Sequence, residues 1–410
     1  MNRLLVVFFL SPFLAPLTWA APSFVLPKRL YATPGRECAV YYTSVFSSVT
    51  PANYAYEAQS QVGRSYLQHW CWTPRKEDAG KEFELVLRAW TDDGCIASFT
   101  TTVEVAAAPR NPGKSVRVAL FADSLTNSGY QNELCKALKA DGFSGYVPVG
   151  SRKPKISGAV RHDGYGGYDC KAFLEYYVVS EDEVSRVQDA AEREQLLSLG
   201  LPVKIVSEWQ RELLKSPLIS FRDGRKTVDV KGWIDKAAGG IAPDVVIVQL
   251  GVNAVFGKRG SAREMREDIR SRVIPEFRAF VSALREQMPH AVFGITTQPL
   301  GCGQDGFAAN YGARFGEVQH RVTMFVLNGE IERFVLGLAD PLVELVPLAH
   351  AIDPVAGFPR KEVPANGRTE AKVLKSVNAL HPTAEGGCQM ADAIAAWYEC
   401  RWNSWSVSKQ

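Results

Sequence analysis

Residues 243–251 read PDVVIVQLG, and they carry the clearest indication of the fold class. A short apolar run rich in β-branched residues and ended by glycine is typical of a strand that is buried on both faces. Strands of that kind occur in parallel sheets whose two faces are covered by helices. VRVALFA (116–122) and HAVFGITTQP (290–299) predict two more strands of the same sheet.

Helical patterns alternate with these strands. They are QNELCKALKADG (131–142), the segment 262–288 around Pro275, and AEGGCQMADAIAAWYECRW (384–402). Such alternation predicts an α/β domain with helices on both faces of a parallel sheet, which we place at residues 114–404. A polar helical stretch at 182–215 is long for a connection, and it is interpreted either as a lid or as a solvated excursion.

The region 22–108 before this domain has an all-β pattern. ECAVYYTSV (37–45) and EFELVLRAWT (82–91) carry the β-branched and aromatic residues of strands. Residues 73–105 resemble the last strands of bacterial immunoglobulin-like modules, which implies a small sandwich. Trp70 and Trp72 share one face of a strand, where core packing is favoured over a sugar-stacking platform.

The first twenty residues (1–20) are typical of a cleavable secretory signal peptide, with one arginine, a short apolar run and small residues before Ala21. A membrane anchor fits less well because Pro12 and Pro16 interrupt the run. We therefore expect a secreted or periplasmic protein without a membrane span.

Composition and charge exclude some classes of function. The net charge is +3 with scattered Lys and Arg, so no basic stripe indicates nucleic-acid binding. Eight cysteines in an exported chain predict disulfide bridges, with the pairing left open. Three of them lie in the first hundred residues and five follow, so these odd numbers mean either a bridge between the domains or free thiols. No Cys or His grouping has the spacing of a metal site, so neither a metal nor another cofactor is expected.

Four short segments lie where strands end or helices begin: FADSLT (121–126), HDGYGGYD (162–169), QLGVNA (249–254) and NALHPTAEGG (378–387). In α/β sheets of this kind, ligands bind outside the carboxyl ends of the strands. Each segment has an ordinary explanation as a cap or a turn. Together they supply a nucleophile, a base and hydrogen-bond donors for an oxyanion, which is the set of groups that acyl transfer requires.

The order of these segments resembles the four blocks of the SGNH, or GDSL-type, serine hydrolases. The resemblance implies a flavodoxin-like three-layer α/β/α fold and an esterase mechanism with Ser124 as nucleophile and His381 as base. It implies an oxyanion hole formed by the Ser124 backbone N–H, a glycine N–H and the Asn253 amide. Gly167 is preferred over Gly164 as that glycine. Asp123 is expected to brace the nucleophile loop rather than to take part in chemistry, and His162 could line the site.

The sequence departs from the family pattern at three positions. Ala122 and Ala254 stand where Gly and Asp are usual, and Asn378 occupies the place of the aspartate that orients the histidine. Three arrangements are left open: a Ser-His-Asn triad, a Ser-His dyad, or an acid from elsewhere. Asp353 is the candidate for such an acid, although an Asp-Pro turn is the commoner role.

The favoured function is a serine ester hydrolase that removes O-acetyl or other short acyl groups from carbohydrate. A lipase, a thioesterase and an O-acetyltransferase would use the same serine and histidine. A further alternative is a catalytically degenerate carbohydrate-binding protein, which the residues at positions 122, 254 and 378 would mark. A Ser124 Oγ beyond hydrogen-bond reach of His381 would favour it.

Overall fold

The computed structural model describes residues 22–152, 159–178, 181–186, 215–222 and 225–407, together with residues 188, 190, 193 and 194. The expected signal peptide lies outside the described residues. The expected lid lies outside them too, except for α4 (Glu181–Arg186) and the single positions named above.

A parallel sheet forms the centre of the larger domain, as expected from the sequence. Its strands are β8 (Val116–Ala122), β9 (Tyr146–Val149), β10 (Asp163–Gly164), β13 (Val245–Gln249), β14 (Val292–Thr296) and β15 (Val343–Val346). β9 and β10 both pair with β8, and β13, β14 and β15 follow on its other side. Every pairing is parallel, so all the carboxyl ends meet at one edge. All five residues of β13 are buried, which explains the unbroken apolar run of the sequence.

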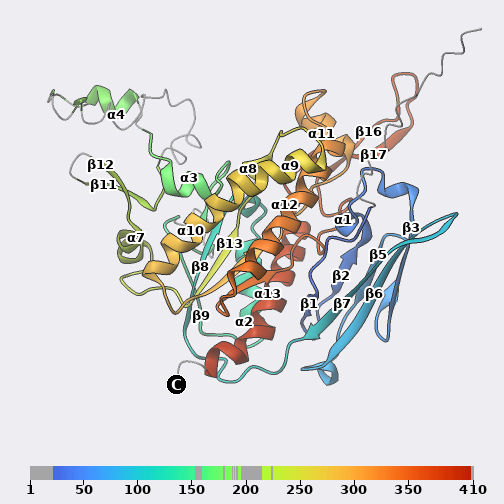
Figure 1. Ribbon diagram of the computed structural model, residues 1–410, viewed down its shortest axis with the longest axis horizontal. Helices are drawn as coiled ribbons and strands as arrows, with labels where there is room; N and C mark the ends of the chain where they lie inside the picture. The colour runs from blue at the N-terminus through green and yellow to red at the C-terminus, as the bar shows by residue number, and fades with distance from the viewer. Residues whose placement is uncertain are drawn as a thin grey trace, which may run out of the picture.

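Helices cover both faces of this sheet, so the domain has three layers (Figure 1). On one face lie α2 (Tyr130–Ala140) and α13 (Ala384–Val407); on the other lie α7 (Val230–Ala237), α10 (Ile274–Gln287) and α12 (Glu317–Leu338). The predicted helix 262–288 is divided into α9 (Ala262–Asp268), a π-helical turn (Ile269–Val273) and α10. The backbone keeps helical angles through all three segments, and the π-helical turn lies directly before Ile274 and Pro275, so the proline stands in a helix that is irregular but not broken.

Shorter elements connect these layers. They are the helices α3 (Cys170–Glu175), α8 (Val252–Val255) and α11 (Gln304–Tyr311), and the hairpins β11–β12 (Ile219–Arg222, Arg225–Val228) and β16–β17 (Arg360–Pro364, Lys372–Ser376). Both α8 and α11 follow strands at the carboxyl edge of the sheet, and both contact the candidate site described below.

The N-terminal module is built from two sheets around a core of its own. One sheet has the order β1-β7-β6-β3 and the other has the order β2-β5-β4. Their strands are β1 (Arg29–Ala32), β2 (Cys38–Tyr41), β3 (Ala55–Ser60), β4 (Arg64–Ser65), β5 (His69–Trp72), β6 (Glu82–Thr91) and β7 (Gly94–Val105); the short helix α1 is Tyr42–Val45. Trp70 is buried, and Trp72 packs edge-on against Phe83, so both fit the core-packing interpretation. The immunoglobulin-like topology stays a prediction.

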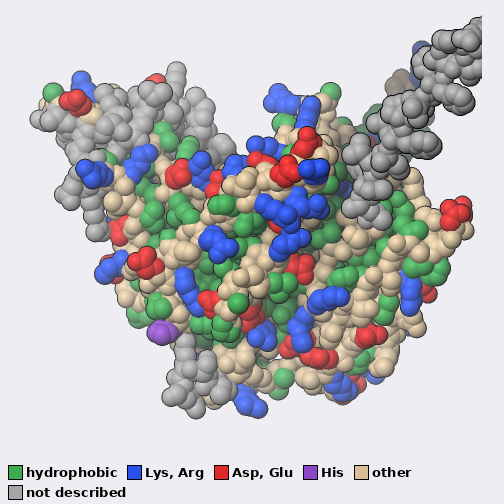
Figure 2. Space-filling view, viewed as in Figure 1, with side chains coloured by type: hydrophobic (Ala, Val, Ile, Leu, Met, Phe, Trp, Pro, Cys, Tyr) green, Lys and Arg blue, Asp and Glu red, His purple; other side chains and the backbone are tan. Residues whose placement is uncertain are grey.

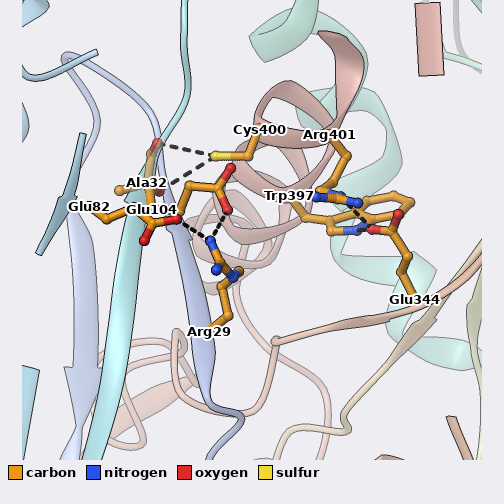
Figure 3. A network of polar contacts seen from close by, with 8 residues as sticks. All are labelled: Arg29, Ala32, Glu82, Glu104, Glu344, Trp397, Cys400 and Arg401. Atoms are coloured by element: carbon orange, nitrogen blue, oxygen red, sulfur yellow. Dashed lines mark hydrogen bonds and ion pairs between the residues drawn. The ribbon is translucent and has the colours of Figure 1, made fainter. Parts of the chain in front are cut away.

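The module is attached to α13 by polar contacts (Figure 3). The Cys400 thiol of α13 lies 3.5 Å from the Glu104 carbonyl oxygen of β7. Arg29 of β1 binds Glu104 across the strands, and Thr33 donates a hydrogen bond of 2.9 Å to the buried Glu399 carboxylate of α13. Because these contacts join β1 and β7 to the longest helix of the other domain, the module has a defined position relative to the sheet.

The prediction of disulfides is wrong for this structure, in which all eight cysteines are free. Cys38 and Cys71 lie on neighbouring antiparallel strands, but Cys38 is opposite Trp72 and Cys71 is opposite Ala39. Side chains of successive strand residues point to opposite faces, so these two thiols lie on different sides of the sheet and cannot bond.

Basic side chains gather near the centre of the face shown in Figure 2. The buried Glu330 carboxylate of α12 binds three arginines: Arg266 of α9, Arg270 of the π-helical turn and Arg333 of α12 itself. Within the residues that the structure describes, no helix combines the length and the apolar composition that crossing a membrane requires.

Candidate active site

The nucleophile turn begins where β8 ends. Asp123 is the N-cap of a 3₁₀ turn (Ser124–Ser128), and its Oδ1 accepts a hydrogen bond of 2.9 Å from the Leu125 N–H. The Asp123 carbonyl oxygen accepts a second bond, from the Thr126 hydroxyl. Asp123 therefore braces the turn, as predicted, and Ser124 stands half-buried at the first position of the turn.

The histidine loop lies between β17 and α13, and neighbouring elements hold it from two sides. Asn310 of α11 accepts a hydrogen bond of 2.7 Å from the Ala379 N–H, and the Cys302 N–H donates to the Ala379 carbonyl oxygen. On the other side, the first turn of α13 packs on the nucleophile turn. A Cβ atom at Gly387 would lie 2.8 Å from Ser128 Oγ, so only glycine permits this close approach.

These two segments bring Ser124 and His381 together, although 257 positions separate them in the sequence. The distance between Ser124 Oγ and His381 Nε2 is 2.9 Å, which is within hydrogen-bond range. Both side chains are half-buried, so a substrate can reach them from solvent. The pair satisfies the geometric requirement for a hydroxyl nucleophile and its base.

The structure does not support Asn378 as the residue that orients the imidazole. Its Oδ1 accepts hydrogen bonds from the backbone N–H groups of Leu380, at 3.1 Å, and of His381, at 2.9 Å. The amide oxygen thus closes the turn that carries the histidine. This correction has a simple physical reason: an Asn side chain readily bonds the backbone two and three residues ahead.

Asp353 is likewise engaged in a turn. Its Oδ1 accepts 2.8 Å hydrogen bonds from the Val355 and Ala356 N–H groups, which is the Asp-Pro turn weighed in the sequence analysis. In the part of the chain that the structure describes, no hydrogen bond or ion pair joins a carboxylate to the His381 ring. Of the three arrangements left open by the sequence, the geometry fits the Ser-His dyad.

The glycine-rich loop runs beside the nucleophile turn. β10 pairs with Phe121 and Ala122 at the end of β8, and the Tyr165 N–H donates to the Ala122 carbonyl oxygen. The Gly164 N–H donates to His162 Nδ1 at 3.0 Å, so that N–H is occupied and His162 acts as a brace.

Gly167, the glycine preferred for the oxyanion hole, differs from Gly164 in its hydrogen bonding. It lies in the turn after β10 and is exposed. Among the described residues no hydrogen bond from its N–H is found, which leaves that donor available to a ligand.

Asn253 joins the glycine loop from the neighbouring strand. Gln249 at the end of β13 pairs with Ala122 at the end of β8, so the residues after both strands meet at one edge. Gly251 has a φ of 131°, a value that favours glycine, and it turns the chain from β13 into α8. Asn253 Nδ2 then donates a 2.9 Å hydrogen bond to the Tyr168 carbonyl oxygen. This amide has a second N–H, which is the group available to an oxyanion.

Burial changes the acidity of two groups at the site. Desolvation raises the pKa of Asp123 to about 7, because its carboxyl is almost fully buried and the hydrogen bond from the Leu125 N–H offsets that effect only in part. Burial lowers the pKa of His381. The imidazole is therefore neutral at neutral pH, which is the form that accepts a proton.

A buried amide network beneath the site was not found by sequence reasoning. Gln249 accepts a hydrogen bond from the Tyr130 hydroxyl and donates one of 2.8 Å to Gln298. The backbone of Gln298 in turn makes two hydrogen bonds with the side chain of Asn328 in α12. The Gln298 N–H donates to Asn328 Oδ1, and Asn328 Nδ2 donates to the Gln298 carbonyl oxygen. A signal was present, since VVIVQL and GITTQP each place a glutamine at the end of an apolar strand.

No protein-family model matches the sequence, and no curated protein is significantly similar to it. Among solved structures, a family 3 carbohydrate esterase from Clostridium thermocellum is 14% identical, with 72% of this chain and 100% of that chain covered and a TM-score of 0.39. A family two carbohydrate esterase from Cellvibrio japonicus is 12% identical, with 92% and 91% covered and a TM-score of 0.32. Phospholipase A1 from Streptomyces albidoflavus is also 12% identical, with 69% and 99% covered and a TM-score of 0.32. Likeness at this level does not decide the activity, which has to be argued from the side chains.

Proposed function

We propose that the chain is a serine ester hydrolase of the SGNH type with a flavodoxin-like catalytic domain. The observation that carries the proposal is the 2.9 Å contact between Ser124 Oγ and His381 Nε2 at the carboxyl edge of the parallel sheet. In the order of the chain, β9 and β10 flank β8 on one side and β13, β14 and β15 follow on the other, which matches the 2-1-3-4-5 order of flavodoxin-like sheets.

The first chemical step is the attack of Ser124 on the ester carbonyl carbon. As the Oγ–C bond forms, the hydroxyl proton passes to His381 Nε2, and the carbonyl oxygen becomes an oxyanion. The neutral state of the imidazole, maintained by its burial, makes this transfer possible at neutral pH.

The oxyanion is stabilised by hydrogen bonds from donors that are already in place. The Ser124 and Gly167 backbone N–H groups and the second Nδ2–H of Asn253 are the proposed donors. The bond from Asn253 to the Tyr168 carbonyl oxygen fixes the amide next to the glycine loop, so little reorganisation is needed.

Collapse of the tetrahedral intermediate breaks the bond to the alcohol, which takes the proton from the imidazolium. The acyl group stays on Ser124 as an ester. Water then loses a proton to His381 and attacks this acyl-enzyme, which releases the acid and restores the serine hydroxyl. A dyad performs both half-reactions, because each needs one base that later acts as an acid.

The proposed substrate is an O-acetyl group, or another short acyl group, on a carbohydrate. The pattern of an exported chain with a β module before the catalytic domain supports a polymeric substrate outside the cytoplasm. An acetyl group needs little apolar pocket, which fits a sequence without a long apolar lid.

An O-acetyltransferase would use the same groups but would exclude water from the acyl-enzyme. A lipase or a thioesterase would differ in the groups that bind the acyl chain.

The test is hydrolysis of 4-nitrophenyl acetate and of acetylated polysaccharide by the purified chain, with Ser124→Ala as the matched control. Turnover that is lost in the alanine variant would support the proposal. The absence of turnover on both substrates would favour the binding-protein alternative. That alternative is less well supported, because a Ser124–His381 distance beyond hydrogen-bond reach would favour it and the observed distance is 2.9 Å.

A further inference from the structure

Three aromatic rings form a row on the N-terminal module. Tyr41 of β2 lies opposite His69 of β5, and their ring centroids are 5.0 Å apart at an interplanar angle of 31°. Tyr66 stacks on the same histidine, with centroids 5.2 Å apart at 27°. Both tyrosine rings thus contact the ring of His69, and these contacts lead outward from the buried Tyr41 to Tyr66 at the surface.

The outer end of this row is unusually exposed. Tyr66 is 47% exposed and the next residue, Leu67, is 89% exposed, although both are apolar side chains at the tip of the β4–β5 hairpin. The polar residues Arg64 and Gln68, which are near them in the sequence, are also exposed. The hairpin tip therefore presents a tyrosine ring and a leucine side chain to solvent between polar neighbours.

The inner end of the row touches the carboxyl edge of the catalytic sheet. The Tyr41 N–H donates a hydrogen bond of 3.1 Å to the carbonyl oxygen of His350, which follows β15 by four residues. The Tyr41 hydroxyl accepts a bond of 3.3 Å from Gln389, in the second turn of α13. Tyr41 therefore lies beside the same edge of the sheet that carries Ser124.

A short chain of contacts connects this point with the histidine loop. Gln389 accepts a hydrogen bond of 2.9 Å from the Asp353 N–H. The turn that begins at Asp353 reaches Gly357, whose carbonyl oxygen accepts a bond of 2.9 Å from the Thr383 N–H. Thr383 is two residues after His381. The ring row and the candidate active site thus border the same loop, which lies between them.

We infer that Tyr66 and Leu67 form a remote glycan-binding subsite, which holds a sugar of the chain whose ester is cleaved at Ser124. The inference rests on the proposed function and extends it to the substrate class, a carbohydrate polymer rather than a single sugar. A pyranose ring has one apolar face ringed by hydroxyls, which matches one exposed tyrosine ring with the polar residues Arg64 and Gln68 near it in the sequence.

Other occupants fit this surface less well. A protein partner or a second copy would need a larger buried area than two side chains provide. Insertion into a membrane also calls for a larger contiguous apolar patch. The contact between Cys400 of α13 and Glu104 of β7, drawn in Figure 3, attaches the module that carries Tyr66 to the domain that carries Ser124. Such an attachment is what a subsite for one extended polymer requires.

The test compares substrates of different length. The probes are 4-nitrophenyl acetate and partially acetylated xylo-, cello-, manno- and chito-oligosaccharides of two and six residues. Wild type is measured beside Tyr66→Ala, Tyr66→Phe and Trp90→Ala. Trp90 is a matched control because it is an exposed aromatic residue of the same module that makes no ring contact with the row among the described residues.

We expect wild type to have a lower KM for the best six-residue substrate than for its two-residue counterpart. Tyr66→Ala should raise the six-residue KM by roughly two- to tenfold, as expected for one lost stacking contact. The kcat, the two-residue KM and the rate on 4-nitrophenyl acetate should not change. Tyr66→Phe, which keeps the ring, and Trp90→Ala should behave like wild type.

Two different failures can be told apart. If wild type hydrolyses 4-nitrophenyl acetate but its KM does not depend on length in any series, or if Tyr66→Ala alters all substrates equally, the subsite is refuted. If wild type hydrolyses nothing, the proposed function fails instead. Calorimetric binding of the six-residue oligosaccharides then decides the subsite alone, since an affinity that Tyr66→Ala does not lower would overturn it.

Discussion

In both the nucleophile turn and the histidine loop, a side-chain oxygen accepts hydrogen bonds from backbone N–H groups that follow it. The residue that supplies this oxygen is an acid in the first segment and an amide in the second. Asp123 precedes the nucleophile and caps the N–H of Leu125, whereas Asn378 precedes the base and caps the N–H groups of Leu380 and His381. The carboxylate is thus placed next to the serine, and the neutral amide is placed next to the imidazole. A serine triad has the reverse preference, because a carboxylate is what stabilises the imidazolium.

This difference indicates that the position of each side chain is explained by its hydrogen bonds to the backbone. Asp123 is nearly fully buried, and its second oxygen, Oδ2, has no hydrogen-bond partner among the described residues. Asn378 is only half-buried, and its oxygen makes two bonds. A buried acid whose Oδ2 has no partner among the described residues therefore lies next to the nucleophile. The corresponding residue before the histidine is an amide, not an acid.

The largest effect is expected from removing either member of the dyad. Ser124→Ala and His381→Ala should each lower kcat/KM for 4-nitrophenyl acetate by at least about 10⁴-fold, because the two groups act as a unit. The double variant should be no slower than the single variants. An additive loss in the double variant would mean that His381 acts on something other than Ser124.

The next largest effect is expected at the oxyanion hole. Asn253→Ala should lower kcat by about 10²- to 10³-fold with a much smaller change in KM, because its N–H binds charge that develops only in the transition state. Asn253→Asp is the matched variant, since it keeps the size of the side chain and removes the donors. A change confined to KM would show that Asn253 only positions the glycine loop through Tyr168.

A smaller effect, in pH rather than in rate, is expected at Asn378. Burial lowers the pKa of His381, so the acid limb of the wild-type kcat/KM profile should lie below pH 6.5. Asn378→Asp can keep the two backbone bonds with one oxygen and offer the other to the ring. A carboxylate near the imidazole favours its charged form, so the limb should move upward by about one pH unit.

Asn378→Ala provides the comparison for that prediction. It removes the turn bonds to Leu380 and His381, so it should lower both the rate and the melting temperature without moving the limb. A limb that stays in place in the aspartate variant as well would place the His381 ring beyond reach of position 378.

The smallest effect on activity is expected at Asp123, where stability is the better measurement. Burial raises the pKa of Asp123 from its ordinary 3.8 to about 7, so the folded protein holds this proton more tightly than the unfolded chain does. Stability present below pH 4 is therefore lost as the pH rises through 7. Asp123→Asn cannot ionise and should gain stability relative to wild type over that window, by a few kcal/mol at most, since one pKa unit is worth about 1.4 kcal/mol.

Melting temperatures of both proteins between pH 4 and 8 would check this prediction. Asp353→Asn is the control, because Asp353 caps an exposed turn with two comparable backbone bonds. If the difference between Asp123→Asn and wild type did not grow with pH, the Asp123 carboxyl would be ionised in the folded protein at a lower pH than its burial indicates.

The sheet and the groups at its edge could be predicted from the sequence alone. PDVVIVQLG could be interpreted as a doubly buried parallel strand because periodicity and burial are local properties of the chain. The same reasoning placed Ser124, Asn253, Gly167 and His381 after strands or before helices, where a parallel sheet brings its carboxyl ends together.

How these groups are connected could be seen only in the folded protein. Whether the Asn378 oxygen faces the ring or the backbone depends on rotations of a single side chain, which no spacing in the sequence encodes. Whether the cysteines pair could likewise not be predicted from the sequence. The strand register that separates Cys38 from Cys71 arises from contacts between distant segments. The contacts among Tyr41, His69 and Tyr66 depend on both levels. The hairpin supplies His69 and Tyr66, and the packing of the module against the edge of the other domain gives Tyr41 its place.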